Sequence, residues 1–266
     1  MIMVRQMRVF LSFDIEEFDV PKEYDSSYNV DRDGMKISAY GTSRILDILN
    51  KENVKATFFC TAKFATIAPE LIIRIHKEGH EVASHGYDHW SRTDNEPMRS
   101  KIILEGITGE KVYGYRQPRM DKVDCLNLVV NEYKYNASLN PTFIPGRYMN
   151  LFEPRKPFYR NDILNIPSSV TPILRIPLFW LSLHLFPLWM YKILCRWALY
   201  VDNILSLYFH PWEFYPLSNL TNTRVPKLIS INSREIMSSR LSEVIKMLKR
   251  KNCQFLTYKE YLTNHD

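Results

Sequence analysis

The sequence predicts an α/β fold built on a parallel sheet or barrel. Short apolar runs that are typical of buried strands alternate with longer segments whose apolar residues recur at helical spacing. This alternation indicates parallel strands joined by helices. The chain has 266 residues, of which 45% are hydrophobic and 24% charged. That length lies in the range of one α/β barrel, so we predict a single domain over residues 1–266.

The expected elements alternate along most of the chain. Strands are predicted at 9–13, 56–61, 81–84, 112–116, 205–209 and 254–257, and helices at 40–53, 69–77, 98–107, 189–200 and 233–251. Residues 136–171 are rich in Pro and Asn and are expected to form long loops with short strands. Functional residues of parallel sheets gather at the carboxyl ends of strands, so the residues just past each strand are the candidates for a site.

Composition and charge exclude several classes of protein. The net charge of +6 comes from 35 basic and 29 acidic residues, and the densest basic stretch, 246–251, lies on a predicted helix. We interpret that stretch as a solvated helix face, so no nucleic-acid partner is expected. The four cysteines form no CxxC pair, which favours neither a zinc knot nor a disulfide framework and indicates a reducing compartment. No secretory signal is recognisable, so a cytoplasmic location is expected.

The apolar segment 176–191 contains no Asp, Glu, Lys or Arg. A membrane-spanning helix needs about 20 apolar residues, and this segment is shorter and carries two prolines. Core packing is the preferred interpretation. The alternative is an apolar cover over the barrel or a surface that touches the membrane, and the latter would mean peripheral membrane association.

Asp14 and Glu16 follow the first strand two residues apart. In extended chain this spacing puts both side chains on the same side, so that two carboxylates face one cavity. Taken alone the pattern is weak, because acidic residues at strand ends are often merely solvated. The neighbouring Glu17 and Asp19 show how common acidic residues are in this stretch.

His85 and His89 are four residues apart, a spacing that brings two imidazoles to one metal on a helical turn or a tight loop. Alone this pair is also weak, since surface histidines are common. Combined with one of the two carboxylates it makes a three-ligand set with open positions for water and substrate, as a catalytic metal requires. Imidazole suits zinc, cobalt, nickel or iron. The remaining carboxylate, Asp14, is then available as a base.

His210 and Arg116 also lie at strand ends. His210 is a candidate general acid, because an unperturbed histidine pKa of about 6.5 allows proton transfer near neutral pH. The alternative is a core histidine beside aromatic residues. An arginine next to Asp14 would keep that carboxylate ionised and oriented, and a surface salt bridge is the alternative for Arg116.

Four stretches carry these candidates: SFDIEE at 12–17, HEVASHGYDH at 80–89, GYRQP at 114–118 and LYFHPWE at 207–213. In order and spacing they resemble the NodB-type polysaccharide deacetylases, carbohydrate esterase family 4, over nearly the whole chain. The second and fourth stretches are the more specific. They most resemble a branch associated with exopolysaccharide and surface-glycan gene products.

The resemblance implies a distorted (β/α) barrel with about seven strands. It implies a metal-dependent hydrolase that removes an acetyl group from an N-acetylated sugar in surface-polysaccharide or precursor metabolism. Its divalent metal is expected to be zinc, with cobalt, nickel or iron as alternatives. The roles implied are base for Asp14, metal ligands for Glu16, His85 and His89, orientation of the base for Arg116, and acid for His210.

The resemblance also implies a substrate groove. Trp212 is expected to wall the acetyl methyl group, and Pro118 and Arg119 are expected to contact the substrate. A backbone N–H just after Pro118 would stabilise the oxyanion that forms during amide hydrolysis.

Three features depart from the pattern of the family. Ile15 separates the two acidic residues of the first stretch, where many members have adjacent aspartates, so the ligand is Glu16 or, less favoured, Glu17. Arg119 stands where an aromatic or small residue is usual. Asn136 stands where an aspartate that supports the acid histidine is expected. Two alternatives therefore stay open: a hydrolase of another non-peptide C–N bond, as in the allantoinase-like relatives, and a catalytically silent carbohydrate-binding protein.

Overall fold

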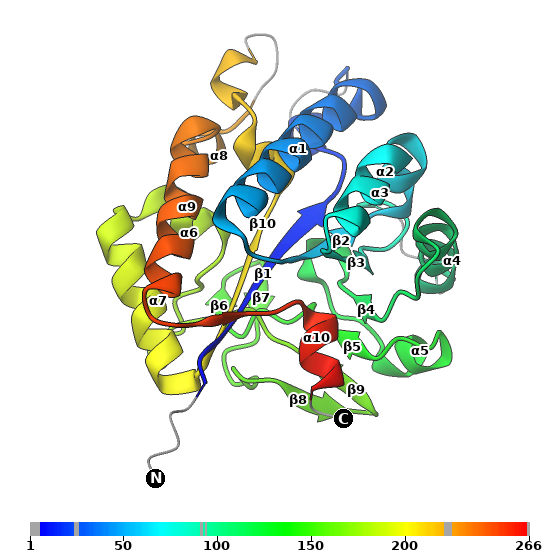
Figure 1. Ribbon diagram of the computed structural model, residues 1–266. Coiled ribbons are helices and arrows are strands. Elements are labelled where there is room, and N and C mark those ends of the chain that lie inside the picture. Colours follow the sequence, from blue (N-terminus) through cyan, green and yellow to red (C-terminus); the bar gives the residue numbers. More distant parts are fainter. Residues whose placement is uncertain (1–5, 24–26, 91–92, 94, 221–224, 265–266) are drawn as a thin grey trace.

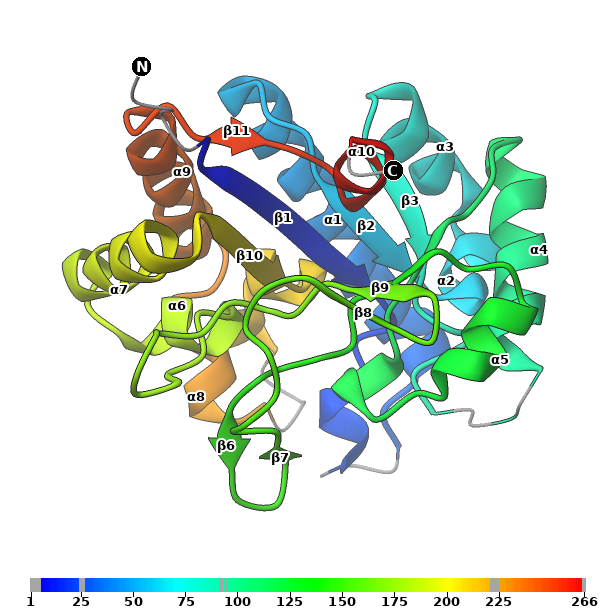
Figure 2. The same cartoon turned by 90° about the horizontal axis from the view of Figure 1, so that it is seen from below.

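A nine-stranded sheet forms the centre of the fold, and helices lie around the outside of it (Figures 1 and 2). The structure is a computed structural model that describes residues 6–23, 27–90, 93, 95–220 and 225–264. The strand order is β10-β1-β2-β3-β4-β5-β9-β8, with β11 pairing with the start of β1. The seven strands from β10 to β9 are parallel, and β8 pairs antiparallel with β9. This path is open, so the sheet is a half-barrel, and the prediction of an α/β fold with about seven strands is confirmed.

The strands of this sheet are short except at its centre. Their bounds are β1 Arg8–Ile15, β2 Thr57–Cys60, β3 Glu81–Ser84, β4 Gly114–Tyr115, β5 Tyr135–Asn136, β8 Phe158–Arg160, β9 Ile163–Asn165, β10 Ile204–Phe209 and β11 Gln254–Phe255. A separate hairpin pairs β6 Phe143–Ile144 with β7 Tyr148–Met149. The region 136–171 thus consists of loops with short strands, as its composition predicts.

The helices include the five predicted ones. Their bounds are α1 Met35–Glu52, α2 Ala62–Ile67, α3 Pro69–Lys77, α4 Glu96–Thr108, α5 Cys125–Val130, α6 Trp180–Leu185, α7 Leu188–Asp202, α8 Lys227–Ser230, α9 Glu235–Lys249 and α10 Tyr258–Thr263. Both α3 and β3 have the predicted bounds, whereas α1 begins at Met35 and not at 40. Proline at the first position opens α3, and Gly79 with φ of 79° follows its end.

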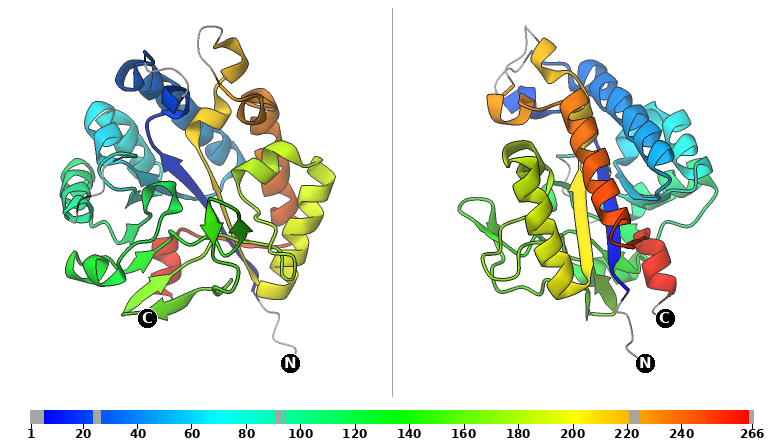
Figure 3. Two further views of the ribbon diagram at one scale, coloured as in Figure 1. Left: turned by 180° about the vertical axis from the view of Figure 1, so that it is seen from behind. Right: turned by 60° about the vertical axis from the view of Figure 1, so that its left-hand side comes forward.

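Alternation along β1 divides the fold into two cores. Val9, Leu11 and Phe13 pack against the outer helices in the larger core, whereas Phe10 packs in the smaller core with Tyr258 of α10. Ser12 and Asp14 share the face of Phe10. The inner face of β1 therefore turns polar toward its carboxyl end. In Figure 3, α7 and α9 run along β10 on the outer side of the sheet.

Helix α1 approaches the segment after β10 at Gly41. That segment is a 3-10 turn, η4, at Pro211–Phe214. A Cβ atom on Gly41 would lie 1.8 Å from the carbonyl oxygen of Pro211, so only glycine allows the two backbones to pack this closely.

The apolar segment 176–191 folds into α6 and the start of α7. Leu178, Leu183 and Tyr191 are fully buried, so core packing accounts for much of it. Leu185 and Trp189 remain exposed. Among the described residues, no helix has the length and apolar character that crossing a membrane would demand.

Candidate active site

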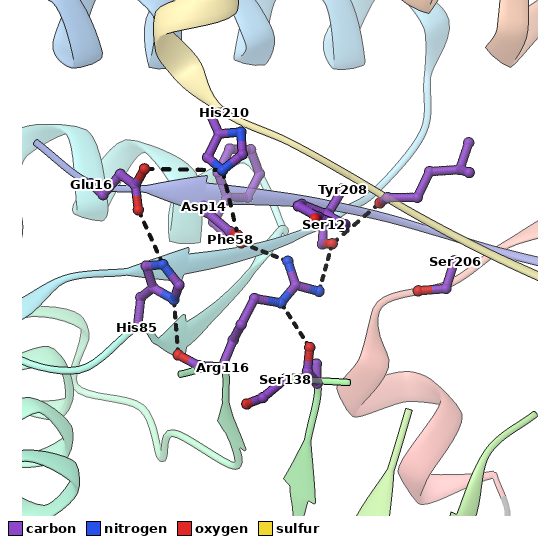
Figure 4. Close-up of polar contacts among 12 residues, drawn as sticks. Ser12, Asp14, Glu16, Phe58, His85, Arg116, Ser138, Ser206, Tyr208 and His210 are labelled. Atoms are coloured by element: carbon purple, nitrogen blue, oxygen red, sulfur yellow. Dashed lines mark hydrogen bonds and ion pairs between the residues drawn. The ribbon is translucent and has the colours of Figure 1, made fainter. Parts of the chain in front are cut away.

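The carboxyl ends of four parallel strands deliver the candidate residues to one place (Figure 4). Asp14 comes from β1 and Glu16 follows it, His85 follows β3, Arg116 follows β4 and His210 follows β10. A cavity of about 450 Å³ opens here. Its lining includes Asp14, Glu16, His85, His89 and His210.

Arg116 is a fully buried guanidinium that holds Asp14. Its Nη1 donates to Asp14 Oδ1 at 2.6 Å, and its Nη2 donates to Ser12 Oγ at 3.0 Å and to the hydroxyl of Tyr258 at 3.3 Å. Its Nε donates to the carbonyl oxygen of Ala137 at 3.1 Å. Because the guanidinium is planar and its donors are fixed from several sides, one oxygen of Asp14 is fixed as well. The other oxygen, Oδ2, lies 3.9 Å from His210 Nε2.

Glu16, His85 and His89 form a compact donor set. Glu16 Oε2 lies 3.2 Å from His85 Nε2 and 3.3 Å from His89 Nε2. His85 Nδ1 donates to the carbonyl oxygen of Arg116 at 2.8 Å, and His89 Nδ1 donates to Asp19 Oδ2 at 2.7 Å. Whenever these rings are neutral, their one proton is held on Nδ1, and Nε2 then presents its lone pair toward Glu16. Histidine ligands in metal sites are commonly oriented in this way.

The chemistry of these donors fits a divalent metal. In the described part of the chain, no three His, Cys, Asp or Glu side chains already have the arrangement that a metal ion requires, so the fit rests on donor type and spacing. Metal–ligand bonds of about 2.0–2.1 Å in tetrahedral geometry separate neighbouring ligand atoms by about 3.3 Å. The two contacts of Glu16 have this spacing. In addition, lone pairs on the Nε2 atoms of His85 and His89 would repel the carboxylate of Glu16 unless a cation or a proton lay between them.

Negative charge dominates this part of the cavity. Burial raises the pKa of Glu16, but the nearby histidines His89, His85 and His210 outweigh it and lower the value to about 2. Burial lowers the pKa of His89, but Glu16 and Asp19 outweigh it and raise the value to about 9. The carboxylates thus attract positive charge to the point where the donor set converges.

His210 is held by a carboxylate and two indole rings. Its Nδ1 lies 3.1 Å from Glu213 Oε1, and its ring stacks on Trp212 with centroids 5.0 Å apart and an interplanar angle of 19°. Trp180 meets the same ring edge-on at 5.4 Å. Burial lowers the pKa of His210, but the hydrogen bond to Glu213 and the charges of Glu16 and Asp14 raise it above its ordinary value. The ring therefore favours its protonated form, as an acid requires.

The three residues expected to contact substrate lie in different places. Trp212 and Arg119 line the cavity, and the guanidinium of Arg119 lies 3.9 Å above the ring of Trp90. Pro118 is buried, packs close to Gly86 and is outside the lining. Aromatic side chains of Tyr148, Trp180 and Tyr208 also line the cavity.

Glu16 and Asn136, which mark two of the departures in the sequence, have distinct surroundings. Glu16 contacts both histidines, whereas Glu17 accepts a hydrogen bond from Thr61 Oγ1 at 3.1 Å, outside the cavity lining. Asn136 donates to Asn165 Oδ1 at 2.9 Å and accepts from Ser138. Its side chain is thus engaged within the β5–β9 region.

The structure adds partners that the sequence prediction missed. Asp19, treated above as an ordinary acidic residue, is 3% exposed and bonds to His89. Glu213 bonds to His210 and also contacts His184. Glu213 belongs to the LYFHPWE stretch, which was a usable signal, and Asp19 follows the SFDIEE stretch. For His184 the sequence offers no signal.

Comparison with known proteins gives a family match over part of the chain. The family model described as polysaccharide deacetylase matches residues 24–138. A peptidoglycan-N-acetylglucosamine deacetylase from Bacillus cereus is 31% identical over 101 residues, which cover 37% of this chain and 36% of that protein. The chain spans about a quarter to about a third of the length of the curated relatives it matches.

Solved structures share the fold over nearly the whole chain. A putative polysaccharide deacetylase from Mycobacterium smegmatis superposes with a TM-score of 0.69 at 19% identity, covering 97% of this chain and 89% of that one. A CE4 family pseudoenzyme from Bacillus anthracis superposes with a TM-score of 0.56 at 14% identity, covering 97% and 66%. At these identities the likeness establishes the half-barrel fold.

Proposed function

Because the family model and the relatives support the polysaccharide deacetylase family, we propose that this chain is a metal-dependent hydrolase of N-acetylated sugars. The observation that carries the proposal is the meeting of three groups in one cavity. These are a carboxylate fixed by Arg116, the donor set of Glu16, His85 and His89, and the imidazole of His210. Amide hydrolysis requires a base, an electrophilic centre and an acid. Asp14, a metal held by the donor set, and His210 would supply them in that order.

Glu16, His85 and His89 would hold the metal, which is zinc in the preferred form of the proposal and cobalt, nickel or iron in the alternatives. When bound, such a metal would supply Lewis acidity for the acetyl carbonyl and for the attacking water. The hydrogen bond from His89 to Asp19 orients one ligand, and that from His85 to the Arg116 carbonyl orients another.

Asp14 and His210 would move the protons. Asp14 Oδ2, the oxygen that Arg116 leaves exposed to the cavity side, accepts a proton as water attacks the acetyl carbon. The backbone N–H of Arg119, just after Pro118, donates to the oxygen that becomes negative. His210 Nε2 then gives its proton to the amide nitrogen as the C–N bond breaks, so that the products are acetate and a sugar amine.

The walls of the cavity suit a sugar ring with an acetyl group. Trp212 offers an apolar surface beside His210 for the methyl group, and Arg119 and Tyr148 line the same cavity. Aromatic faces with a few placed polar groups are typical of small-molecule sites. Pro118 contributes by shaping the loop that carries Arg119.

An acetate-release assay tests the proposal. Purified protein is loaded with Zn²⁺, Co²⁺, Ni²⁺ or Fe²⁺ and offered N-acetylated nucleotide sugars, lipid-linked sugars and oligosaccharides. We expect metal-dependent acetate release from at least one class. Saccharide binding without release would favour the silent carbohydrate-binding protein, and hydrolysis of another C–N bond alone would favour the allantoinase-like alternative.

The cellular context is a further part of the proposal. We place the chain with the exopolysaccharide and surface-glycan branch, in the cytoplasm, where the free thiols of its four cysteines would persist. Peripheral membrane contact would use the exposed Leu185, Trp189 and Ile193. Liposome flotation, with and without anionic lipid, tests this contact, and absence of binding removes the membrane from the proposal.

A further inference from the structure

Glu213 divides its carboxylate between two buried histidines. It lies in η4, three residues after His210. Its Oε1 is 3.1 Å from His210 Nδ1 and also accepts the backbone N–H of His210. Its Oε2 is 3.2 Å from His184 Nε2. Both Glu213 and His184 are 0% exposed, so the protein must satisfy this charge without bulk water.

The proton positions follow from the partners of His184. Its Nδ1 lies 2.7 Å from the carbonyl oxygen of Ile231, which only accepts, so Nδ1 carries a proton. Its Nε2 faces a carboxylate oxygen. Two lone pairs do not approach at 3.2 Å in a buried site, so one further proton lies between His184 and Glu213. A hydrogen bond therefore joins His184 to Glu213 and satisfies the second carboxyl oxygen inside the protein.

The same carboxylate selects the orientation of His210. Nδ1 of His210 donates to Glu213, which leaves Nε2 directed into the cavity, 3.9 Å from Asp14 Oδ2. Trp212 and Trp180 enclose the ring on one face and at one edge and oppose its rotation. An acid that delivers its proton from Nε2 needs this orientation.

We propose that Glu213 is the positioning residue for His210. His184 in turn holds Glu213, so that the three side chains form a buried hydrogen-bonded chain, His210–Glu213–His184. The inference deepens the proposed function and rests on it. It also bears on Asn136, where the family resemblance leads one to expect an aspartate that supports the acid. Because Glu213 contacts His210 directly, His210 has a supporting carboxylate even though residue 136 is an asparagine.

Substitutions at Glu213 test the proposal through turnover. Glu213→Gln keeps the shape and an oxygen acceptor for His210 but removes the charge, so kcat should fall about 10–100-fold with KM and metal content unchanged. Glu213→Leu should lower kcat as far as His210→Ala does. The double variant Glu213→Leu/His210→Ala should have the same kcat as His210→Ala alone, because the two residues act as one unit. His184→Phe should lower kcat by about tenfold, since Glu213 loses its second hydrogen-bond partner.

Glu81→Gln is the matched control, because Glu81 is a buried carboxylate, 7% exposed, that bonds to Thr57 and Tyr135 away from the cavity. It should retain wild-type kcat. Wild-type kcat in Glu213→Gln, or additive losses in the double variant, would overturn the proposal. The isosteric Gln variant keeps this test decisive if the Leu variant does not fold.

A readout without turnover separates this proposal from the proposed function. Nitrogen-15 NMR of histidine-labelled protein, at a pH where His210 is neutral, should show the Nδ1–H tautomer for His210. Loss of the signal in His210→Gln assigns it. Glu213→Leu should shift the ring to a mixture of tautomers, and an unchanged spectrum would contradict the role of Glu213. A wild-type protein that shows this tautomer but releases no acetate would overturn only the proposed hydrolase function.

Discussion

Two buried histidines flank β3, and they lie in opposite kinds of surroundings. His80, before the strand, accepts the N–H of Ala56 on Nδ1 at 3.3 Å and packs its ring 5.2 Å from Phe58. His85, after the strand, donates from Nδ1 to a carbonyl oxygen and turns Nε2 toward Glu16. Both are at most 5% exposed. The two residues have the same side chain and similar burial, so their different surroundings come from the end of the strand at which each one lies.

The electrostatic surroundings differ in the same sense. Burial lowers the pKa of His80 to about 4, and the positive charges of Lys55 and Arg74 add to this effect. At the carboxyl edge of the sheet, burial lowers the pKa of His89 and His210, but carboxylates outweigh it and raise both values. The amino edge of the sheet thus keeps a histidine neutral, whereas the carboxyl edge collects negative charge that suits a cation and an acid.

The largest difference between the two ends should appear in metal binding. His85→Gln should remove tight binding of one divalent metal per chain, because it deletes one of three ligands. His80→Gln, the same change at the other end of β3, should keep the metal, since the amide oxygen can still accept the N–H of Ala56. Metal content after dialysis measures both. Equal metal content in the two variants would contradict the assignment of Glu16, His85 and His89 as the metal ligands.

The next largest effect should come from the base. Asp14→Asn should lower kcat about 10²–10⁴-fold, the usual worth of a positioned proton-transfer group, and leave the metal bound. Arg116 can still donate to the amide oxygen of the variant, so the fold should persist. Acetate release and metal content, measured on the same sample, separate the two effects. A variant that releases acetate at nearly the wild-type rate would show that Asp14 is not the base.

The smallest effect should be one of stability at the amino edge. Because the pKa of His80 is about 4 in the folded chain and about 6.5 when unfolded, only the unfolded state gains its proton as the pH falls between these values. The contribution of His80 to the free energy of unfolding is full above pH 6.5 and should drop by up to about 3 kcal/mol by pH 4.

Urea denaturation at several pH values, in wild type and His80→Gln, isolates this contribution. The stability gap between the two proteins should narrow or reverse as the pH falls. Parallel curves at all pH values would mean that His80 is not kept neutral by its surroundings, and the contrast between the two ends of β3 would lose its electrostatic part.

Local patterns were enough to predict the frame of the fold. The bounds of α3 and β3 follow from apolar spacing, a proline at the helix start and a glycine after its end. The helices α2, α5 and α10 were missed because six residues offer too few repeats to reveal a helical period.

The candidate site was predictable only in part, for a different physical reason. Asp14 and His85 could be proposed because each directly follows a predicted strand. The pairing of His89 with Asp19 spans 70 positions, and that of His184 with Glu213 spans 29. Such contacts depend on how loops and helices fold back over the sheet, which residue spacing does not encode.

The close approach of Gly41 to Pro211 couples the outside of the protein to its chemistry. Pro211 directly follows His210, and α1 lies on the outer side of the sheet. Any side chain at residue 41 must force α1 and η4 apart, and a displaced η4 would carry the imidazole of His210 with it. A selection for altered substrate preference should therefore find residue 41, on a helix that contributes nothing to the cavity lining, as intolerant of substitution as the reacting groups themselves.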